Sequence, residues 1–326
     1  MSSSNGLHVI ILMTLFFNIA YSQDSIEYYE PLAKDSLRVG LGDDDFMPFI
    51  RSGYTLMLPE NRNINGVLIF LEDSGYDDKN KSAKQLYKLA SKSKFAVLSV
   101  STEIPFDFYF LETSFFTVNR HIKHAFKNYK LPNKNIFFLG ASLTGHRALR
   151  YIKLMSENRS SFQLKIQGIV ICNFALDWVR KWNQYQREIK IDRNNLWEAK
   201  FISYTLETYL GGSPLKASEG YYNFSAYSYF DKKYRNIKFY KNYAIKAYIE
   251  PAIKYRLMTY AQTMYENSAT DIVSFLAELM LAGNKNTELE VLQPHDNLAK
   301  NINADATWKR VDKIELMRWI ELHSLN

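Results

Sequence analysis

The sequence predicts an α/β protein with a mostly parallel, doubly wound sheet and a helical cap insertion. Short apolar runs alternate along the chain with longer amphipathic stretches, which is the order of strands and helices in such a sheet. The runs are apolar along their whole length, as expected for strands that helices cover on both faces. The segment 177–240 interrupts this order, because it is rich in Trp, Tyr, Arg and Lys and contains no strand pattern.

The individual elements follow from these patterns in chain order. The predicted strands cover residues 54–59, 66–72, 95–101, 135–142, 166–174, 244–251 and 287–294. Amphipathic stretches predict helices over 82–93, 111–128, 144–158, pieces of 253–283, and 312–323. We interpret the segment 177–240 as a mainly helical cap over the carboxyl ends of the strands, where open α/β sheets place their sites.

The N-terminal residues 1–22 are predicted to be a secretory signal peptide. An apolar run over 9–17 is followed by Ala20, Tyr21 and Ser22, which resembles a cleavage site; an uncleaved N-terminal anchor is the alternative. We expect export to the periplasm, to an outer-membrane-associated location or to the medium, with residues 23–326 as one domain. No other run is long enough for a membrane helix, so no transmembrane segment is expected in the mature chain.

Composition excludes some partners and chemistries. The 326 residues are 47% hydrophobic, and their net charge of +7 is scattered over the chain, so a solvated basic surface is expected and no nucleic-acid partner. The single cysteine, Cys172, lies in an apolar run and is expected to be a small buried hydrophobe. No cofactor motif is present, and His121 and His124, although spaced to share a helix face, are expected to be solvated rather than to bind a metal.

The segment 137–152, FFLGASLTGHRALRYI, carries the strongest functional signal. Its apolar run ends at Gly140, and a helical pattern begins directly after Ser142, so the serine lies at the apex of a strand-to-helix turn. This arrangement is the nucleophile elbow of serine hydrolases, whose usual pattern is Gly-x-Ser-x-Gly. Here Thr144 takes the place of the second glycine, which Gly145 follows, and a β-branched residue is expected to fit only if the turn opens slightly.

The same turn suggests where an oxyanion would be stabilised. The amide of Leu143, at the start of the helix, is one candidate donor. The second would come from the loop LEDSGYDD, where Ser74 or Gly75 is the candidate, although the carboxylates of Glu72 and Asp73 would oppose a developing negative charge there.

From residue 67 to the C-terminus the chain resembles the α/β-hydrolase fold. Longer stretches resemble a narrower group of exported α/β-hydrolase-like proteins of Bacteroidota: ALDWVRKWN (175–183), LETYLGGSP (206–214), YIEPAIKYR (248–256), LAGNKNTELEVL (281–292) and TWKRVDKIELMRWI (307–320). The resemblance implies Ser142 as the nucleophile, an acid at the position of Ala252 and a histidine at that of Ala306. Both partner positions hold alanine, so the triad is degenerate.

Other residues are candidates to replace the missing partners. His295 follows the last predicted strand and Glu250 ends the preceding one, so Ser142, Glu250 and His295 would keep the chain order serine, acid, histidine. A solvated His295 and a structural Glu250 are the alternatives. His146, early in the elbow helix, and Asp177, after the strand at 166–174, are poorer candidates for a base and an acid.

Two functions follow. The first is a catalytically impaired pseudoenzyme that acts as a binding or structural component at the cell envelope, with a protein partner or a small-molecule or acyl ligand under its aromatic-rich cap. The second is a secreted, esterase-like serine hydrolase that uses Ser142 with His295 as a substitute base.

Overall fold

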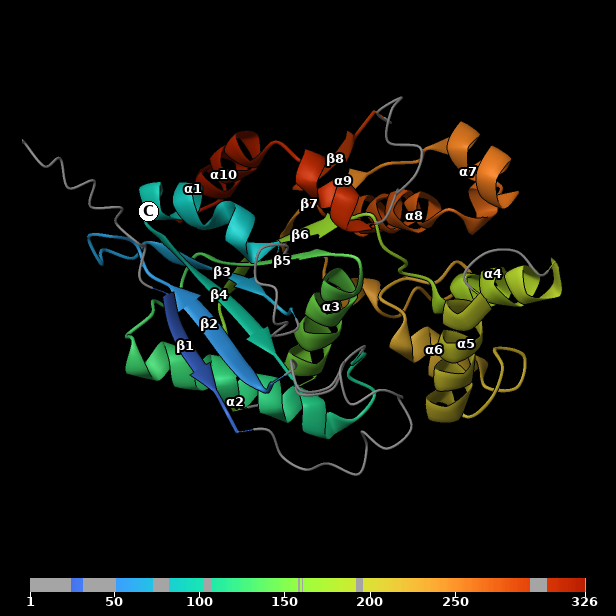
Figure 1. Ribbon diagram of the computed structural model, residues 1–326, viewed down its shortest axis with the longest axis horizontal. Coiled ribbons are helices and arrows are strands. Elements are labelled where there is room, and N and C mark those ends of the chain that lie inside the picture. Colours follow the sequence, from blue (N-terminus) through green and yellow to red (C-terminus); the bar gives the residue numbers. More distant parts are fainter. Residues whose placement is uncertain are drawn as a thin grey trace, which may run out of the picture.

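The computed structural model describes residues 25–31, 51–72, 82–102, 107–157, 159, 161–191, 196–293 and 304–325. Within these residues an eight-stranded sheet runs through the centre of the molecule (Figure 1). In sheet order its strands are β1 (Ser25–Tyr29), β2 (Gly53–Met57), β4 (Phe95–Ser101), β3 (Gly66–Phe70), β5 (Ile136–Ala141), β6 (Ile166–Cys172), β7 (Ala244–Ile249) and β8 (Thr287–Val291).

The pairing confirms the predicted mostly parallel sheet. The six strands β4, β3, β5, β6, β7 and β8 run parallel to one another, whereas β2 is antiparallel to β4 and β1 is antiparallel to β2. The strands β3, β4, β5 and β7 are buried at every residue, as their continuous apolar runs predict. Strand β1 was not predicted, because an edge strand with mostly exposed residues needs no apolar run.

Helices cover both faces of the sheet (Figure 1). One hydrophobic cluster lies between the sheet and helices α2 (Glu112–Asn128), α3 (Leu143–Ser156) and α8 (Ser268–Leu281). A second cluster lies on the other face, under η4 (Ala83–Leu86), α1 (Tyr87–Lys92), α9 (Ala304–Arg310) and α10 (Lys313–Leu322). This is the doubly wound arrangement.

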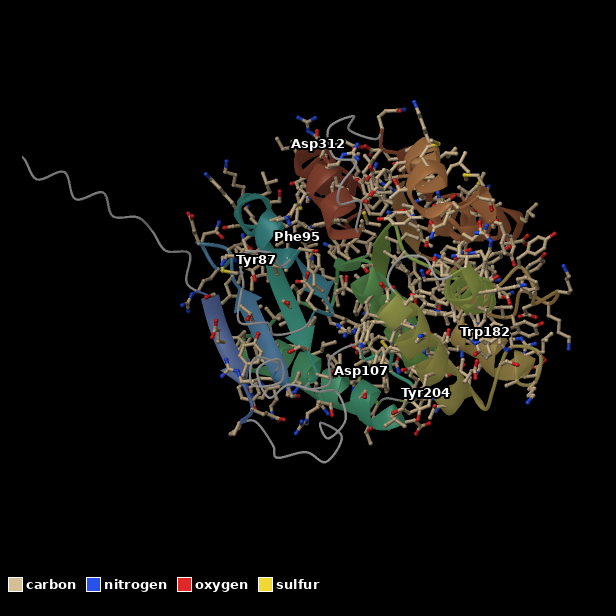
Figure 2. All side chains as sticks on the ribbon, turned by 45° about the vertical axis from the view of Figure 1, so that its right-hand side comes forward. Tyr87, Phe95, Asp107, Trp182, Tyr204 and Asp312 are labelled. Atoms are coloured by element: carbon tan, nitrogen blue, oxygen red, sulfur yellow. The ribbon has the colours of Figure 1, made fainter. Side chains whose placement is uncertain are left out.

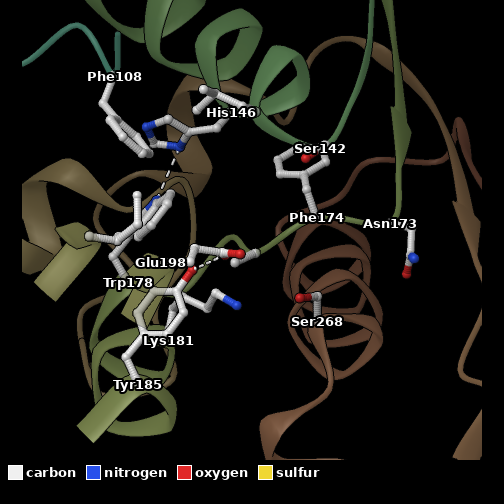
Figure 3. A pocket seen from close by; sticks show the side chains of 13 residues that line it. Phe108, Ser142, His146, Asn173, Phe174, Trp178, Lys181, Tyr185, Glu198 and Ser268 are labelled. Atoms are coloured by element: carbon white, nitrogen blue, oxygen red, sulfur yellow. Dashed lines mark hydrogen bonds between the residues drawn. The ribbon is translucent and has the colours of Figure 1, made fainter. Parts of the chain in front are cut away.

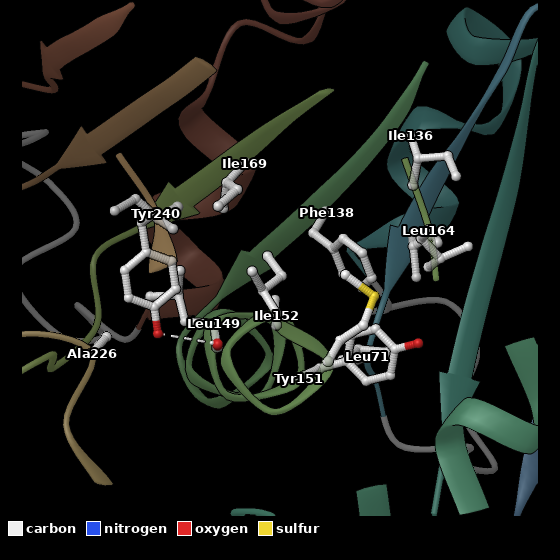
Figure 4. Packing of buried hydrophobic residues seen from close by; sticks show 14 of the residues in the cluster. Leu71, Ile136, Phe138, Leu149, Tyr151, Ile152, Leu164, Ile169, Ala226 and Tyr240 are labelled. Carbon is white, nitrogen blue, oxygen red and sulfur yellow. Dashed lines mark hydrogen bonds between the residues drawn. The ribbon is translucent and has the colours of Figure 1, made fainter. Parts of the chain in front are cut away.

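Helix α3 is anchored at the centre of the first cluster. Phe138 of β5 packs against Tyr151 of the helix, with 5.3 Å between the ring centroids (Figure 4). On the other side of the helix, the Tyr240 hydroxyl donates a hydrogen bond of 3.2 Å to the carbonyl of Leu149. The helix that begins at Ser142 is therefore fixed over most of its length.

The described residues between β6 and β7 form helices and no strand, as predicted for the cap. These are α4 (Trp178–Ile191), α5 (Leu196–Leu210), α6 (Ser218–Phe224) and η5 (Ile237–Phe239). The first three share a hydrophobic cluster of their own, to which Phe108 also belongs. Of the aromatic residues of the cap, Trp178 and Tyr221 are buried, whereas Trp197 is 63% exposed. Trp182 and Tyr204 lie on the same helical group (Figure 2).

The chain between β7 and β8 forms α7 (Ile253–Tyr260), η6 (Met264–Glu266) and α8. In the parts of the chain that the structure describes, no helix combines the length and the apolar character needed to span a bilayer. The predicted signal segment 1–22 lies outside the described residues.

Candidate active site

Ser142 occupies the strained position that a nucleophile elbow requires. Its backbone has φ 56° and ψ −134°, a conformation that residues with a side chain rarely adopt. The chain reaches it directly from β5, and α3 begins at the next residue. A Cβ on Gly140 would lie 2.4 Å from the backbone nitrogen of Gly145, so strand and helix approach too closely here for any other residue.

Thr144 stabilises the turn from inside. Its hydroxyl accepts a hydrogen bond of 2.8 Å from the amide of Ala141 and donates one of 2.6 Å to the carbonyl of the same residue. Glycine is required one residue later, at Gly145, because a Cβ there would lie 2.1 Å from the ring of Phe174. The structure thus accommodates threonine by bonding its side chain back to the end of β5, with glycine one position later.

Ser142 opens into a cavity of about 320 Å³ between the sheet and the cap (Figure 3). The apolar part of its wall comes from both sides and comprises Phe108, Leu143, Phe174, Ala175, Trp178 and Ile202. Ser142 is half-buried, and none of the residues drawn in Figure 3 forms a hydrogen bond with its hydroxyl. The size and the lining suit a small acyl group or another partly apolar ligand.

The cap side of the cavity is polar. Lys181 and Tyr185 of α4 and Glu198 of α5 line it, and the Tyr185 hydroxyl donates a hydrogen bond of 2.7 Å to Glu198. The ammonium group of Lys181 lies over the Tyr185 ring, 4.3 Å from its centroid. Burial lowers the pKa of Lys181, an effect that the nearby charges of Glu198 and Glu188 oppose.

His146 lines the same cavity, but its ring is already committed. The indole nitrogen of Trp178, which can only donate, bonds to His146 Nδ1 at 3.1 Å. The hydrogen of the neutral imidazole therefore lies on Nε2, so neither nitrogen offers a lone pair to Ser142. Burial first, and then the positive charges of Arg150 and Arg147, hold the pKa of His146 well below its usual value. These contacts favour a structural role for His146, in which its ring binds Trp178 of the cap.

Glu250 and Ala252 lie at the carboxyl end of β7. The Glu250 carboxylate is 2% exposed, accepts a hydrogen bond of 3.0 Å from the Thr307 hydroxyl and forms an ion pair with Arg310. Ala252, at the position of the expected acid, is buried in a left-handed conformation with φ 44°. Ala306, at the position where the resemblance leads us to expect a histidine, lies in α9, one residue before Thr307.

A polar connection joins this ion pair to the cavity wall. Asn173 follows β6 and lines the cavity, and its amide nitrogen donates a hydrogen bond of 3.2 Å to the Thr307 hydroxyl. Within the described part of the chain, its buried carbonyl oxygen Oδ1 has no hydrogen-bond partner.

Two carboxylates that the sequence placed near the serine have other contacts. Asp177 accepts hydrogen bonds from the amides of Val179 and Arg180 and thus caps α4. Glu72 accepts hydrogen bonds from the amides of Ser82 and Ala83 at the start of η4. Neither residue is among those that line the cavity, and Asp73, the other carboxylate expected to oppose an oxyanion, lies outside the described residues.

The expectation of a solvated histidine pair on α2 is wrong. His121 is 1% exposed and bonds to the Ser52 hydroxyl at 2.7 Å, because the helix face packs on β2. Burial lowers its pKa to about 4. His124 bonds to the Tyr54 hydroxyl and to Asn128. Among the described residues no group of His, Cys, Asp and Glu is arranged to hold a metal ion.

Three further predicted site residues are Leu143, His295 and Gly75. Leu143 directly follows Ser142, is the first residue of α3 and lines the cavity. His295 and Gly75 lie outside the described residues. The sequence reasoning missed Lys181, Glu198 and Asn173. The spacing of Trp178, Lys181 and Tyr185 would have placed Lys181 on the same face of α4 as two buried aromatic rings.

Several solved structures have a similar fold. An acylaminoacyl peptidase from Pyrococcus horikoshii superimposes with a TM-score of 0.53 at 11% identity over 92% of the chain; the chain spans 40% of that protein's length. An esterase from Pyrococcus furiosus matches with a TM-score of 0.52 at 10% identity, covering 92% of this chain and 91% of that one. Carboxyl esterase 2 from the fungus Tuber melanosporum has a TM-score of 0.52 at 10% identity, covering 95% and 87%.

No protein-family profile and no curated protein sequence matches the chain. At such low identity the structural matches establish the fold alone. With its eight-stranded, mostly parallel sheet, its flanking helices and these neighbours, the chain has the α/β-hydrolase fold.

Proposed function

We propose that the protein is a serine hydrolase that cleaves ester bonds, with Ser142 as the nucleophile. One observation carries the proposal: a half-buried serine keeps the strained elbow conformation, φ 56°, at the edge of a 320 Å³ cavity. Backbone strain at a residue with a side chain is costly, about 1–3 kcal/mol, and is typical of functional sites. The esterases of the same fold support this function over a purely structural one.

The proposed reaction is acyl transfer through the serine. Ser142 Oγ attacks the ester carbonyl while a base removes its proton, and the amide of Leu143 stabilises the oxyanion. The alcohol leaves with a proton from the same base, and water then releases the acid from the acyl-enzyme. His295 is the proposed base, because His146 is committed to Trp178 and Glu250 to Arg310.

A fluorophosphonate probe tests this proposal, because it reacts with an activated serine. We expect stoichiometric labelling of the wild-type protein, loss in Ser142→Ala, and at least a thousandfold slower labelling in His295→Ala. Ser268→Ala is the matched control, since Ser268 lines the same cavity and should leave labelling unchanged. A well-folded wild-type protein that is never labelled would overturn the proposal.

One observation favours a second function, a non-catalytic binding or structural role at the cell envelope. The position of the expected acid is a buried alanine, Ala252, and the nearest substitute, Glu250, is engaged by Arg310. The cavity would then bind a ligand without cleaving it. Absence of labelling combined with saturable ligand binding would support this role.

Export is a separate proposal that rests on residues 1–22. Cell fractionation and N-terminal sequencing of the mature protein test it. A mature chain that begins near Gln23 in an envelope or extracellular fraction is the expected result, and an unprocessed protein in the cytoplasm would refute it.

A further inference from the structure

The cap contributes a charged group to the cavity that acyl transfer does not use. Lys181 points from α4 into the cavity, toward the side where Ser142 and Ser268 lie (Figure 3). Lys181 is half-buried. A lysine in such a place loses hydration, and this loss must be offset by contacts with its ammonium group.

The contacts of the ammonium group within the protein are weak. Gln184 Oε1 lies 3.5 Å from Lys181 Nζ, at the limit of a hydrogen bond, and the other contact is with the Tyr185 ring. The described residues show no ion pair of Lys181 within 4.0 Å, and the charges of Glu198 and Glu188 act on its ammonium group without such a contact. Glu198, which lines the same wall, accepts the hydrogen bond of Tyr185.

We propose that the cavity selects ligands with a carboxylate group, which Lys181 binds from the cap side. This inference rests on the proposed function in taking the cavity at Ser142 as the substrate site, and it names the substrate class: acyl chains that end in a carboxylate. In a half-buried site the attraction between ammonium and carboxylate is stronger than in water. The apolar walls at Phe174 and Ile202 accommodate the chain between the two ends.

The opposite wall determines the orientation of the ligand. Asn173, which lines this wall, has a carbonyl oxygen without a hydrogen-bond partner among the described residues, and the negative partial charge of this oxygen disfavours a carboxylate here. The carboxylate is therefore directed to Lys181, while the reacting carbonyl lies toward Ser142. The negative charge of Glu198, which lines the same wall as Lys181, repels a bound carboxylate. Removing this charge therefore tests whether the carboxylate lies near Lys181.

Calorimetric titration with hexanoate and with its neutral analogue hexanamide tests the inference. Neither compound is an ester, so the measurement does not depend on catalysis. We expect hexanoate to bind the wild-type protein at least about tenfold more tightly than hexanamide. Equal affinities, or no detectable binding of either compound, would refute the inference.

Four variants assign the preference to one charge. Lys181→Met should reduce the preference to about one, whereas Lys181→Arg should retain it. Lys200→Met, which removes an exposed lysine of α5, is the matched control and should leave the preference unchanged. Glu198→Gln keeps an acceptor for Tyr185 and removes the repulsion, so it should strengthen hexanoate binding several-fold.

The outcomes separate this inference from the proposed function. A preference that persists in Lys181→Met, or that Lys200→Met removes equally, refutes the role of Lys181. If Glu198→Gln weakens hexanoate binding, the bound carboxylate does not lie near Glu198 and Lys181, and the inference fails. A preference for carboxylate in a protein that fluorophosphonate never labels would refute catalysis by Ser142 and leave the inference intact.

Discussion

The pairing of Glu250 with Arg310 can be tested by removing one partner at a time. Glu250 is 2% exposed, and its charge is balanced by Arg310 and by one hydroxyl, that of Thr307. Arg310→Met would remove the ion-pair partner of this buried carboxylate, and an unpaired buried charge costs about 3–5 kcal/mol. Glu250→Gln leaves the uncompensated charge on Arg310, which is 21% exposed and can be hydrated, so its cost should be about 1–2 kcal/mol.

Thermal unfolding measures this asymmetry. A change of 1 kcal/mol shifts the midpoint of a large domain by about 2 °C, so Arg310→Met should lower Tm by roughly 6–10 °C and Glu250→Gln by roughly 2–4 °C. The double variant should be more stable than Arg310→Met alone, because it no longer contains the unpaired carboxylate. Equal costs for the two single variants would refute the view that Glu250 is held by Arg310.

The same variant tests whether Glu250 is a catalytic acid. If Glu250 oriented a histidine beside Ser142, Glu250→Gln would slow fluorophosphonate labelling by about 10⁴-fold, as loss of the orienting acid does in a serine protease triad. With Glu250 engaged by Arg310, we expect labelling to change by only a few-fold. A collapse of labelling at an unchanged Tm would show that the ion pair is not the main role of Glu250.

Three further predictions concern the elbow and its helix. Gly140→Ala should destabilise the fold by about 1–3 kcal/mol and more than Gly145→Ala in urea unfolding, because its Cβ meets backbone whereas that of Gly145 meets a side chain, the ring of Phe174. Thr144→Val should cost about 1–2 kcal/mol through loss of two hydrogen bonds within the turn, and Thr144→Ser should recover most of it; equal stability of the two variants would contradict this reasoning. Because the pKa of His146 is lowered in the folded state, the unfolded chain alone binds this proton below pH 6.5. Stability should therefore fall as pH drops, by about 1.4 kcal/mol per unit for this group, and His146→Gln should show a shallower slope between pH 7.5 and 5.

The sheet and the elbow could be predicted because their determinants are local. The run FFLGA is buried throughout as β5, and the change from an apolar run to a helical pattern at Ser142 marks the elbow. Strand β1 could not be predicted in this way. It lies at the edge of the sheet with mostly exposed residues, so its pairing with β2 is not encoded in an apolar pattern.

The polar part of the site could not be predicted because it depends on contacts between distant segments. Glu250 and Arg310 are 60 residues apart, and Asn173 and Thr307 are 134 apart. Sequence patterns give the face of a helix on which Lys181 lies, but the surface against which that face packs depends on how the cap docks on the sheet. The role of such residues becomes apparent only when the tertiary structure brings them to one cavity.

The same contacts show why stability and catalysis can be separated in this protein. Ala252 lies two residues after Glu250, and Ala306 lies directly before Thr307. The Thr307 hydroxyl forms hydrogen bonds with both Asn173 and Glu250, and Arg310 forms an ion pair with Glu250. Alanine at these two positions therefore leaves this buried carboxylate with its partners. The fold should be equally stable whether or not Ser142 is activated, so fluorophosphonate labelling of well-folded protein reports on the base beside Ser142 and not on misfolding.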